Sequence, residues 1–503
     1  MLGYWRPHND YQTYLIEKIS PIFLSDRPLV EQYEKALSKL YSLDLDPLKP
    51  IIEGYYSHTG APAANQPELF RSFILMSELK VHSIPKWVRM MRNNRILAYM
   101  VGLEPSQTPG VGSHYDLVNR LWLENPEVEY ESLHSLHNYN RKPHKKLKKN
   151  QKQPPRHPGI IQKLVDLALQ GASFDSRPEL LMQQIFAKVG VEPSAKAGLL
   201  GDVKKLSVSG DGTCINSGGS SYGVKVCDCV KQGVYNCDCK RKFSDPGARW
   251  GWDSYHENWF YGYSEYILST HNKNLKCELP LYLRLVQASR FDGVSAVVAL
   301  QEAQLLYDEY IIIRFHGDGA HDNYAMYEYL DKCGIKAFIP LNETNKGNFK
   351  HPPYVRVDEN GVPICMAGHK AVFWGFNKDR CRLKYRCPLA TGKIASCPYK
   401  GQCSSSDYGR CFYTKPSWDL RLFTEVPRGS IEWKEEMNSR TSSERVNKRL
   451  LNDYGLELSR TRGKKRIFWW SVIHSVNIHL DARLKASVFS FVRLLENRLA
   501  TAA

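Results

Sequence analysis

The chain has 503 residues, too many for one simple core, so two or three domains of about 100–200 residues each are expected. A hydrophobic content of 42% and an aromatic content of 12% exclude an intrinsically disordered protein. The formal net charge of +17 favours a polyanionic partner, either nucleic acid or an anionic membrane surface.

The membrane is the weaker of these two partners. The amino terminus, MLGYWRPHNDYQ, has no basic segment followed by an apolar run, so no signal peptide is expected. The most apolar late stretch, residues 467–480, is interrupted by His474, Asn477 and His479 and is predicted to be a buried helix. We therefore expect a cytoplasmic, nucleoid-associated protein without a membrane partner.

Residues 1–135 are predicted to form a helical N-terminal domain, because apolar residues recur there at helical spacing. One such set includes Leu69, Phe70, Phe73 and Ile74, and a later segment is expected to begin at Ser113 as N-cap. Two roles are open for this domain, namely DNA recognition and assembly of a dimer.

A basic linker with connecting helices is predicted for residues 136–200. Within it, residues 141–159 carry eight Lys or Arg, four prolines and no acid, a composition that cannot bury apolar surface. It is open whether this run is only a solvated spacer or also binds phosphates. The candidate phosphate contacts are Lys145, Lys146, Lys148 and Lys149.

An α/β domain is predicted from residue 201 onward. The expected order in residues 201–341 is three strands, a helix, a strand, a helix and a strand, with an antiparallel meander followed by parallel strands. Residues 342–430 are rich in Lys, Arg, Gly, Pro and Cys and are predicted to be an insertion with short strands. Residues 431–503 return to helices and complete the domain.

Three acids fall at notable places in this order of elements. Asp211 is expected where the first strand ends or turns, and Asp318 just beyond a buried strand, at the kind of edge where ligands gather in open α/β sheets. Glu444 lies on a later helix, where Thr441 and Glu444 have the spacing of a capping box. Taken singly, each acid is equally well explained as a turn or capping residue.

Taken together, the segments resemble the DDE transposases of bacterial insertion sequences. The resemblance rests on SGDGT, DPGARWGWDSYHENWFYGYSEYILST, LPLYLRLVQASRFDG, FHGDGAHDN, RTSSERVNKRL and GLELSRTRGKKRIFWWSVIHSVNIHL, in this order, and on helical residues 60–122. It implies an RNase H-like catalytic core with Asp211, Asp318 and Glu444 as catalytic residues. It also implies cleavage at the ends of a mobile element and transfer of the 3′-OH to target DNA.

Three carboxylates suit this chemistry because phosphodiester cleavage builds negative charge on several oxygens. Two Mg²⁺ ions about 3.5–4 Å apart, with Mn²⁺ as a substitute, can stabilise that charge and prefer oxygen ligands. We assign Asp211 as the bridging ligand, with Asp318 and Glu444 as the flanking ligands.

The helix around Glu444 follows the family pattern in part. Many relatives carry a Tyr–Arg–Glu–Lys pattern here, and Arg440 occupies the arginine position. Met437 and Leu451 stand at the tyrosine and lysine positions, so the subgroup stays unassigned. Lys448, one turn after Glu444, is predicted either to contact DNA phosphate or to pair with Glu444 on the surface.

Thirteen cysteines without a secretory signal are not expected to form disulfides. One group has the spacing C-x-C-x7-C-x-C, and a second lies in the insertion; both are possible structural zinc sites, or simply reduced cysteines in loops. The candidate ligands are Cys227, Cys229, Cys237 and Cys239 in the first group and Cys387, Cys397, Cys403 and Cys411 in the second.

The insertion is basic, and related transposases use such insertions to hold the DNA end. Trp374 is either a stacking platform for an unpaired base or a local core residue. The expected partners are element ends and target DNA, with a homodimer on DNA as the active form. Rival predictions are a nuclease without strand transfer, a catalytically idle transposase-derived DNA-binding protein, and a zinc-organised regulatory factor.

Overall fold

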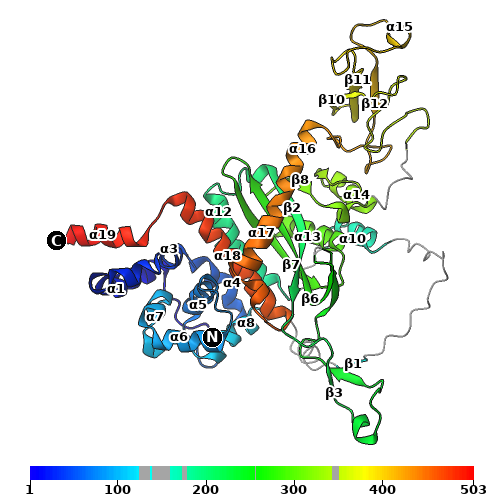
Figure 1. The fold of residues 1–503 in the computed structure, drawn as a ribbon. Coiled ribbons are helices and arrows are strands. Elements are labelled where there is room, and N and C mark those ends of the chain that lie inside the picture. Colours follow the sequence, from blue (N-terminus) through cyan, green and yellow to red (C-terminus); the bar gives the residue numbers. More distant parts are fainter. Residues whose placement is uncertain (124–135, 139–158, 173–177, 255, 343–350, 503) are drawn as a thin grey trace.

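The structure is a computed structural model that describes residues 1–123, 136–138, 159–172, 178–254, 256–342 and 351–502. Helices make up the first 120 residues, and a mixed sheet lies beside them (Figure 1). In that view a small β-rich insertion extends from one end of the sheet and a cysteine-containing lobe from the opposite end. The prediction of a mixed α/β protein with a helical N-terminal region is confirmed.

The N-terminal helices form where apolar residues recur at helical spacing, and prolines occupy the first turns of α5 and α6. The helix expected to begin at Ser113 begins instead at Val111, after Gly110. The N-terminal helices are α1 (His8–Ser25), α2 (Arg27–Glu31), α3 (Glu34–Ser42), α4 (Lys49–Ile52), α5 (Gln66–Glu78), α6 (Ile84–Asn93), α7 (Arg95–Val101) and α8 (Val111–Arg120). The connecting helices are α10 (Ile160–Leu169), α11 (Leu180–Phe186) and α12 (Glu192–Lys196).

The central sheet has the strand order β5-β6-β2-β8-β9, and β7 also pairs with β6. Pairing is antiparallel for β6 with β2, β5 and β7, and parallel for β2 with β8 and β8 with β9. The predicted antiparallel meander followed by parallel strands is therefore confirmed. The strands are β2 (Leu206–Asn216), β5 (Arg249–Asp253), β6 (Asn258–Asn272), β7 (Cys277–Gln287), β8 (Ile312–His316) and β9 (Lys336–Phe338).

Two helices make the crossovers between the later strands. They are α13 (Asp292–Leu306), between β7 and β8, and α14 (Tyr324–Lys332), between β8 and β9. Helix α10 packs against both of them. Strand β8 runs parallel to β2, so the carboxyl ends of the paired segments lie at the same edge of the sheet. Asp318, which follows β8, therefore lies beside β2.

The segment between β2 and β5, called the cysteine lobe below, contributes β3 and β4 to a three-stranded sheet in the order β1-β4-β3. Strand β1 of this sheet comes from earlier in the chain. The three strands are β1 (Leu136–Asn138), β3 (Val224–Lys225) and β4 (Lys240–Lys242). The insertion has its own antiparallel sheet and its own small core, formed by Ala371, Leu383, Tyr385, Leu422 and Phe423. Its elements are β10 (Val372–Asn377), β11 (Arg382–Arg386), α15 (Lys400–Cys403) and β12 (Cys411–Thr414).

Helix α18 (Lys464–Ser487) packs against both the N-terminal helices and the sheet. As predicted, residues 467–480 are buried, because α18 packs against α5 and α3 and against β7. Phe73 meets Trp469 edge to face at 5.4 Å, and Ser77 Oγ lies 2.7 Å from His474 Nδ1. The other C-terminal helices are α16 (Ile431–Met437), α17 (Thr441–Lys448) and α19 (Phe491–Ala502).

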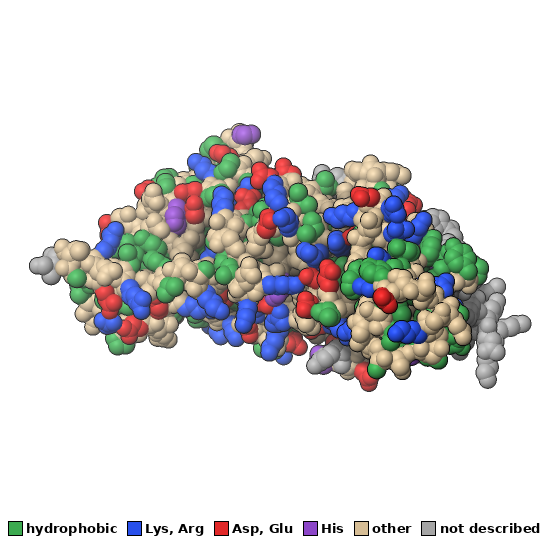
Figure 2. Space-filling view, turned by 90° about the horizontal axis from the view of Figure 1, so that it is seen from above, with side chains coloured by type: hydrophobic (Ala, Val, Ile, Leu, Met, Phe, Trp, Pro, Cys, Tyr) green, Lys and Arg blue, Asp and Glu red, His purple; other side chains and the backbone are tan. Residues whose placement is uncertain are grey.

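Lys and Arg side chains are numerous on the face of the molecule that Figure 2 shows. Seen from above the insertion, Lys and Arg are spread over the whole face and are interspersed with acidic groups (Figure 2). Within the described residues, no helix has both the length and the apolar character needed to cross a bilayer.

Candidate functional site

Asp211 and Asp318 lie at the same edge of the parallel part of the sheet. The parallel pairing of β2 with β8 ends at Ser209 and His316. Asp211 follows Ser209 by two residues, and Asp318 follows His316 by two residues, so the two acids occupy matching positions beyond the last pair. Asp211 is not at a strand end or turn as predicted, since β2 continues to Asn216 through antiparallel pairing with β6.

The environment of Asp211 disfavours its charged form. Burial, followed by the nearby carboxylates of Asp318 and Asp292, raises the pKa of Asp211 to about 7. Asn447 on α17 donates a hydrogen bond from Nδ2 to Asp211 Oδ2 at 3.1 Å. Asp211 is thus a half-buried carboxylate with two acidic neighbours and one neutral donor.

Asp318 is held by His321 three residues later. Asp318 Oδ1 lies 2.6 Å from His321 Nδ1 and accepts the Ala320 N–H at 3.0 Å. The opposite ring nitrogen, Nε2, is hydrogen-bonded to the Tyr266 hydroxyl at 2.8 Å. Burial raises the pKa of Asp318, but the hydrogen bond and charge of His321 outweigh burial and leave the pKa below its ordinary value.

Asp292 is a third acid at this edge of the sheet and was not among the site residues predicted from the sequence. It is the first residue of α13, and its carboxylate lies so close to Gly212 that a side chain at position 212 would collide with it. Burial, with a contribution from Asp318, raises the pKa of Asp292. Its position at the start of a helix, five residues after the end of β7, is the signal that could have found it.

Glu444 is on the helix that packs over β2, but its carboxylate faces Arg440. The two side chains form an ion pair at 2.8 Å, and the Glu444 side chain is 49% exposed. Asn447, which bonds Asp211, is three residues further along and so shares the helix face with Glu444. Lys448 is exposed one turn after Glu444.

The alternative explanation of Thr441 and Glu444 as a capping box is wrong. Residue Arg440 before α17 already has helical dihedral angles and gives no side-chain cap, because α16 runs into α17 through residues 438–440. The Thr441 hydroxyl donates instead to the Asn438 carbonyl at 2.9 Å. Glu444 is therefore not needed to begin its helix.

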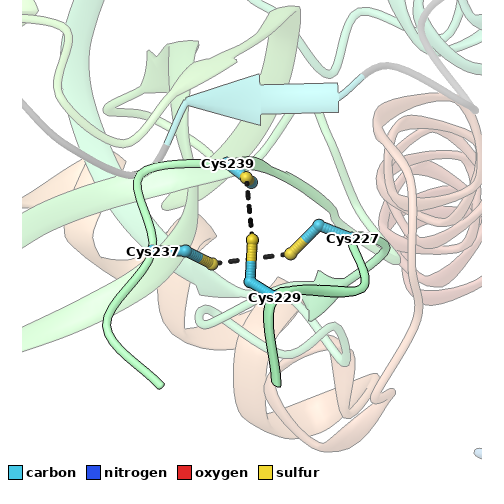
Figure 3. Close-up of side chains that lie close together, drawn as sticks. All are labelled: Cys227, Cys229, Cys237 and Cys239. Atoms are coloured by element: carbon cyan, nitrogen blue, oxygen red, sulfur yellow. Dashed lines mark hydrogen bonds between the residues drawn. The ribbon is translucent and has the colours of Figure 1, made fainter. Parts of the chain in front are cut away.

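Four cysteines of the lobe converge on one point. Figure 3 shows their sulfur atoms directed toward one another, with Cys227 Sγ 3.5 Å from Cys237 Sγ and Cys229 Sγ 3.5 Å from Cys239 Sγ. The backbone of Cys229 and the thiol of Cys237 lower the pKa of Cys227 to about 7, which favours the thiolate that metals require. The cluster can hold a metal ion such as Zn²⁺.

Across the described part of the chain, this cluster is the only group of three or more His, Cys, Asp or Glu whose ligand atoms all lie within 4.8 Å of one another. Asp211, Asp318 and Glu444 are thus not drawn together to that extent. The second predicted cysteine group is not gathered either. Cys387, Cys397 and Cys403 line a pocket of about 570 Å³ together with Cys365, whereas Cys411 does not line it.

Trp374 is not a local core residue, since its side chain is 52% exposed on β10. The Arg386 guanidinium lies 4.2 Å from the centre of the Trp374 ring and 3.5 Å from that of Tyr408. One face of Trp374 is therefore covered by a cation. The candidate phosphate contacts Lys145, Lys146, Lys148 and Lys149 lie outside the described residues.

Comparison of the chain with protein-family models and with curated proteins gave no match in either case.

Proposed function

We propose that this chain is an insertion-sequence transposase of the DDE type, with an RNase H-like catalytic core that acts on DNA in the presence of Mg²⁺. The observation that carries the proposal is that Asp211 and Asp318 occupy equivalent positions, each two residues beyond the last parallel pair of β2 and β8. The antiparallel meander followed by two parallel strands supports the RNase H-like part.

The donor set fits a hard divalent cation. Asp211 and Asp318 are oxygen ligands of the type that Mg²⁺ prefers, and Asp292 adds a third carboxylate beside them. Carboxylates in a partly buried site repel one another, so a cation between them removes a cost that the metal-free protein bears. When bound, Mg²⁺ would supply an activated nucleophile and stabilise charge on the scissile phosphate.

The residues then have separate tasks. Asp211, Asp318 and Glu444 are the residues that would hold the metal. Asn447 orients Asp211 through its 3.1 Å hydrogen bond. Glu444 lies three residues before Asn447 on α17, so its side chain would have to leave Arg440 before its carboxylate could join the ligand set.

A second candidate is a DNA-binding protein derived from a transposase but without cleavage activity. The observation that favours it is the Arg440–Glu444 ion pair, which holds the third carboxylate outward and half exposed. This candidate keeps the same fold and DNA affinity, so only a cleavage assay separates the two.

The decisive experiment incubates the purified protein with a labelled copy of its own element's end and a target plasmid in Mg²⁺. We expect a nick at the element boundary and joined products, with rates at least about 100-fold lower for Glu444→Gln and Asp211→Asn at unchanged DNA affinity. The matched control is Glu435→Gln, an exposed glutamate on α16. Binding without cleavage in both Mg²⁺ and Mn²⁺ would favour the idle DNA-binding protein, and cleavage without joined products a nuclease.

A further inference from the structure

The Arg440–Glu444 ion pair belongs to the same stripe of helix as the residue that contacts Asp211. Arg440 Nη2 lies 2.8 Å from Glu444 Oε1, and Asn447, whose amide reaches Asp211, follows Glu444 by three residues. The helical backbone is continuous from Arg440 into α17, so positions 440, 444 and 447 line up along one side. The third predicted metal ligand is therefore held on the correct side of its helix, but by a cation.

The charge of Arg440 also acts on both aspartates of the site. Burial raises the pKa of Asp211 to about 7, and Arg440 is one of the groups that counteract this rise. Burial also raises the pKa of Asp318, and the groups that lower it again are His321 and, to a smaller extent, Arg440. A guanidinium that stabilises these carboxylates as anions repels a metal ion placed beside them. Arg440 thus opposes metal binding both by its charge and by its contact with the third ligand.

The backbone of this segment is fixed on β2, so an exchange of partners involves side chains alone. Ser209 Oγ donates to the Ser439 carbonyl at 3.1 Å, and Ser442 Oγ donates to Ser209 Oγ at 3.1 Å. Ser439 and Ser442 are buried. The side chains of Arg440 and Glu444 are 29% and 49% exposed, and exposed side chains change rotamer rapidly. Helix α17 can keep its place while the ion pair opens.

We propose that Arg440 keeps Glu444 out of the metal site until a DNA phosphate binds the guanidinium, so that the ligand set is completed only on DNA. Phosphate is a bidentate partner for a guanidinium and competes directly with a carboxylate for it. An exposed ion pair is weak enough to be exchanged in this way. The proposal rests on the proposed function and concerns its regulation: metal affinity and DNA binding are coupled through one pair of side chains.

The first measurement is the Mn²⁺ affinity of the full chain without DNA, at pH 8, from the electron paramagnetic resonance signal of the free ion. We expect Glu444→Gln to bind Mn²⁺ like the wild type, because Glu444 is not yet a ligand. Arg440→Gln should bind about three- to tenfold more tightly. Arg440→Gln/Glu444→Gln should lose part of that gain, since the released carboxylate is missing. Arg440→Lys, which can still pair with Glu444, should stay close to the wild type.

The second measurement repeats the titration with a duplex copy of the element's own end. DNA should raise the Mn²⁺ affinity of the wild type about threefold or more, and the gain should be smaller in Arg440→Gln and in Glu444→Gln because one partner of the exchange is absent. The matched control is Arg445→Gln. Arg445 lies on the same helix and forms a similar ion pair with Glu278 at 2.7 Å, so this variant should respond to DNA like the wild type. Thermal unfolding verifies that each variant folds.

Two results would overturn the proposal. One is weaker Mn²⁺ binding by Glu444→Gln without DNA, because Glu444 would then already be a ligand. The other is an Arg440→Gln protein with the affinity and the DNA response of the wild type.

The same titrations separate this proposal from the proposed function. Mn²⁺ binding that does not depend on Asp211, measured with Asp211→Asn, would refute the metal site and this proposal with it. The full pattern of affinities without cleavage or joining of DNA would support the exchange and refute only the transposase activity.

Discussion

The surroundings of the Asp211 carboxylate favour binding of a positive charge, either a proton or a metal ion. The carboxylate is half-buried beside Asp318 and Asp292, and among the described residues only the amide of Asn447 donates a hydrogen bond to it. Without a metal, this arrangement makes proton binding the simplest way to relieve repulsion, so the pKa rises to about 7. A divalent cation must therefore compete with a proton for this residue.

This competition predicts that Mg²⁺ or Mn²⁺ affinity depends on pH. The pKa of Asp211 is raised from 3.8 to about 7, so the residue is mostly protonated below pH 7 and ionised above it. Apparent metal affinity should rise up to about tenfold per pH unit below pH 7 and level off near pH 8. Isothermal titration calorimetry at several pH values, in buffers of different ionisation enthalpy, measures both affinity and proton release.

The variant Asp292→Asn provides the matching test of cause. Removing this neighbouring charge should lower the pKa of Asp211 and move the rise in affinity to lower pH. The control is Asp308→Asn, an exposed aspartate after α13 that should leave the profile unchanged. A profile that stays in place in Asp292→Asn would contradict the role given to this carboxylate.

At the scale of elements, the cysteine lobe folds around a few short strands and the four-sulfur cluster. Strands β3 and β4 have few residues. Many side chains from β3 to β4 are exposed, including Val224, Val230 and Tyr235. Such a segment buries too little apolar surface to be stable alone, so a bound metal would supply much of its stability.

We predict one tightly bound Zn²⁺ per chain, lost in Cys227→Ser/Cys237→Ser. The serine hydroxyl is a poor replacement for a thiolate, and two remaining sulfurs cannot close a tetrahedral site. Elemental analysis of the purified protein and release of zinc to a colorimetric chelator measure the stoichiometry. Cys381→Ser, at an exposed cysteine outside the cluster, should retain the metal. Equal zinc content in the wild type, the double variant and Cys381→Ser would show that the metal is bound at another site.

The elements that the sequence predicted well are those whose signal is local. Alternation of apolar and polar residues predicted β2, and the apolar run before Asp318 predicted β8, although the observed burial is less regular, with Ser209 buried and Ile311 exposed. Contacts between distant segments were not readable in this way. Asn447 meets Asp211 only because α17 packs over β2, and Asp292 reaches Gly212 only through the turn into α13. The capping box, which was the alternative explanation of Glu444, fails for a related reason, because α16 continues through residues 438–440 into α17.

At the scale of the whole molecule, the N-terminal helices, the sheet and α18 share one hydrophobic core. A buried charge lies at the junction. Lys39 Nζ is 2.5 Å from Glu78 Oε2 and 2.8 Å from Asp481 Oδ1, with a side chain 1% exposed. It also donates to the Tyr454 hydroxyl at 2.9 Å. Lys39 therefore links helices α3, α5 and α18.

Replacing this cation should be costly. Lys39→Met removes the buried cation and leaves Glu78 and Asp481 paired only with the more exposed Lys35, and we expect a loss of about 1–3 kcal/mol in the free energy of unfolding. Lys35→Met removes a neighbouring lysine that pairs with the same acids but is 59% exposed, and should cost less than about 1 kcal/mol. Denaturant titration followed by tryptophan fluorescence measures both. Equal losses would show that burial of Lys39 is not the cause.

The burial of α18 also determines when this protein can fold during its synthesis. Ser77 and His474, which are hydrogen-bonded, are separated by 397 positions in the sequence. A ribosome that adds about 5–20 residues per second needs roughly 20–80 seconds to produce the later partner after the earlier one. For that time the apolar faces of α3 and α5 lack the helix that covers them, so the nascent chain depends on chaperones or on temporary packing of its own helices.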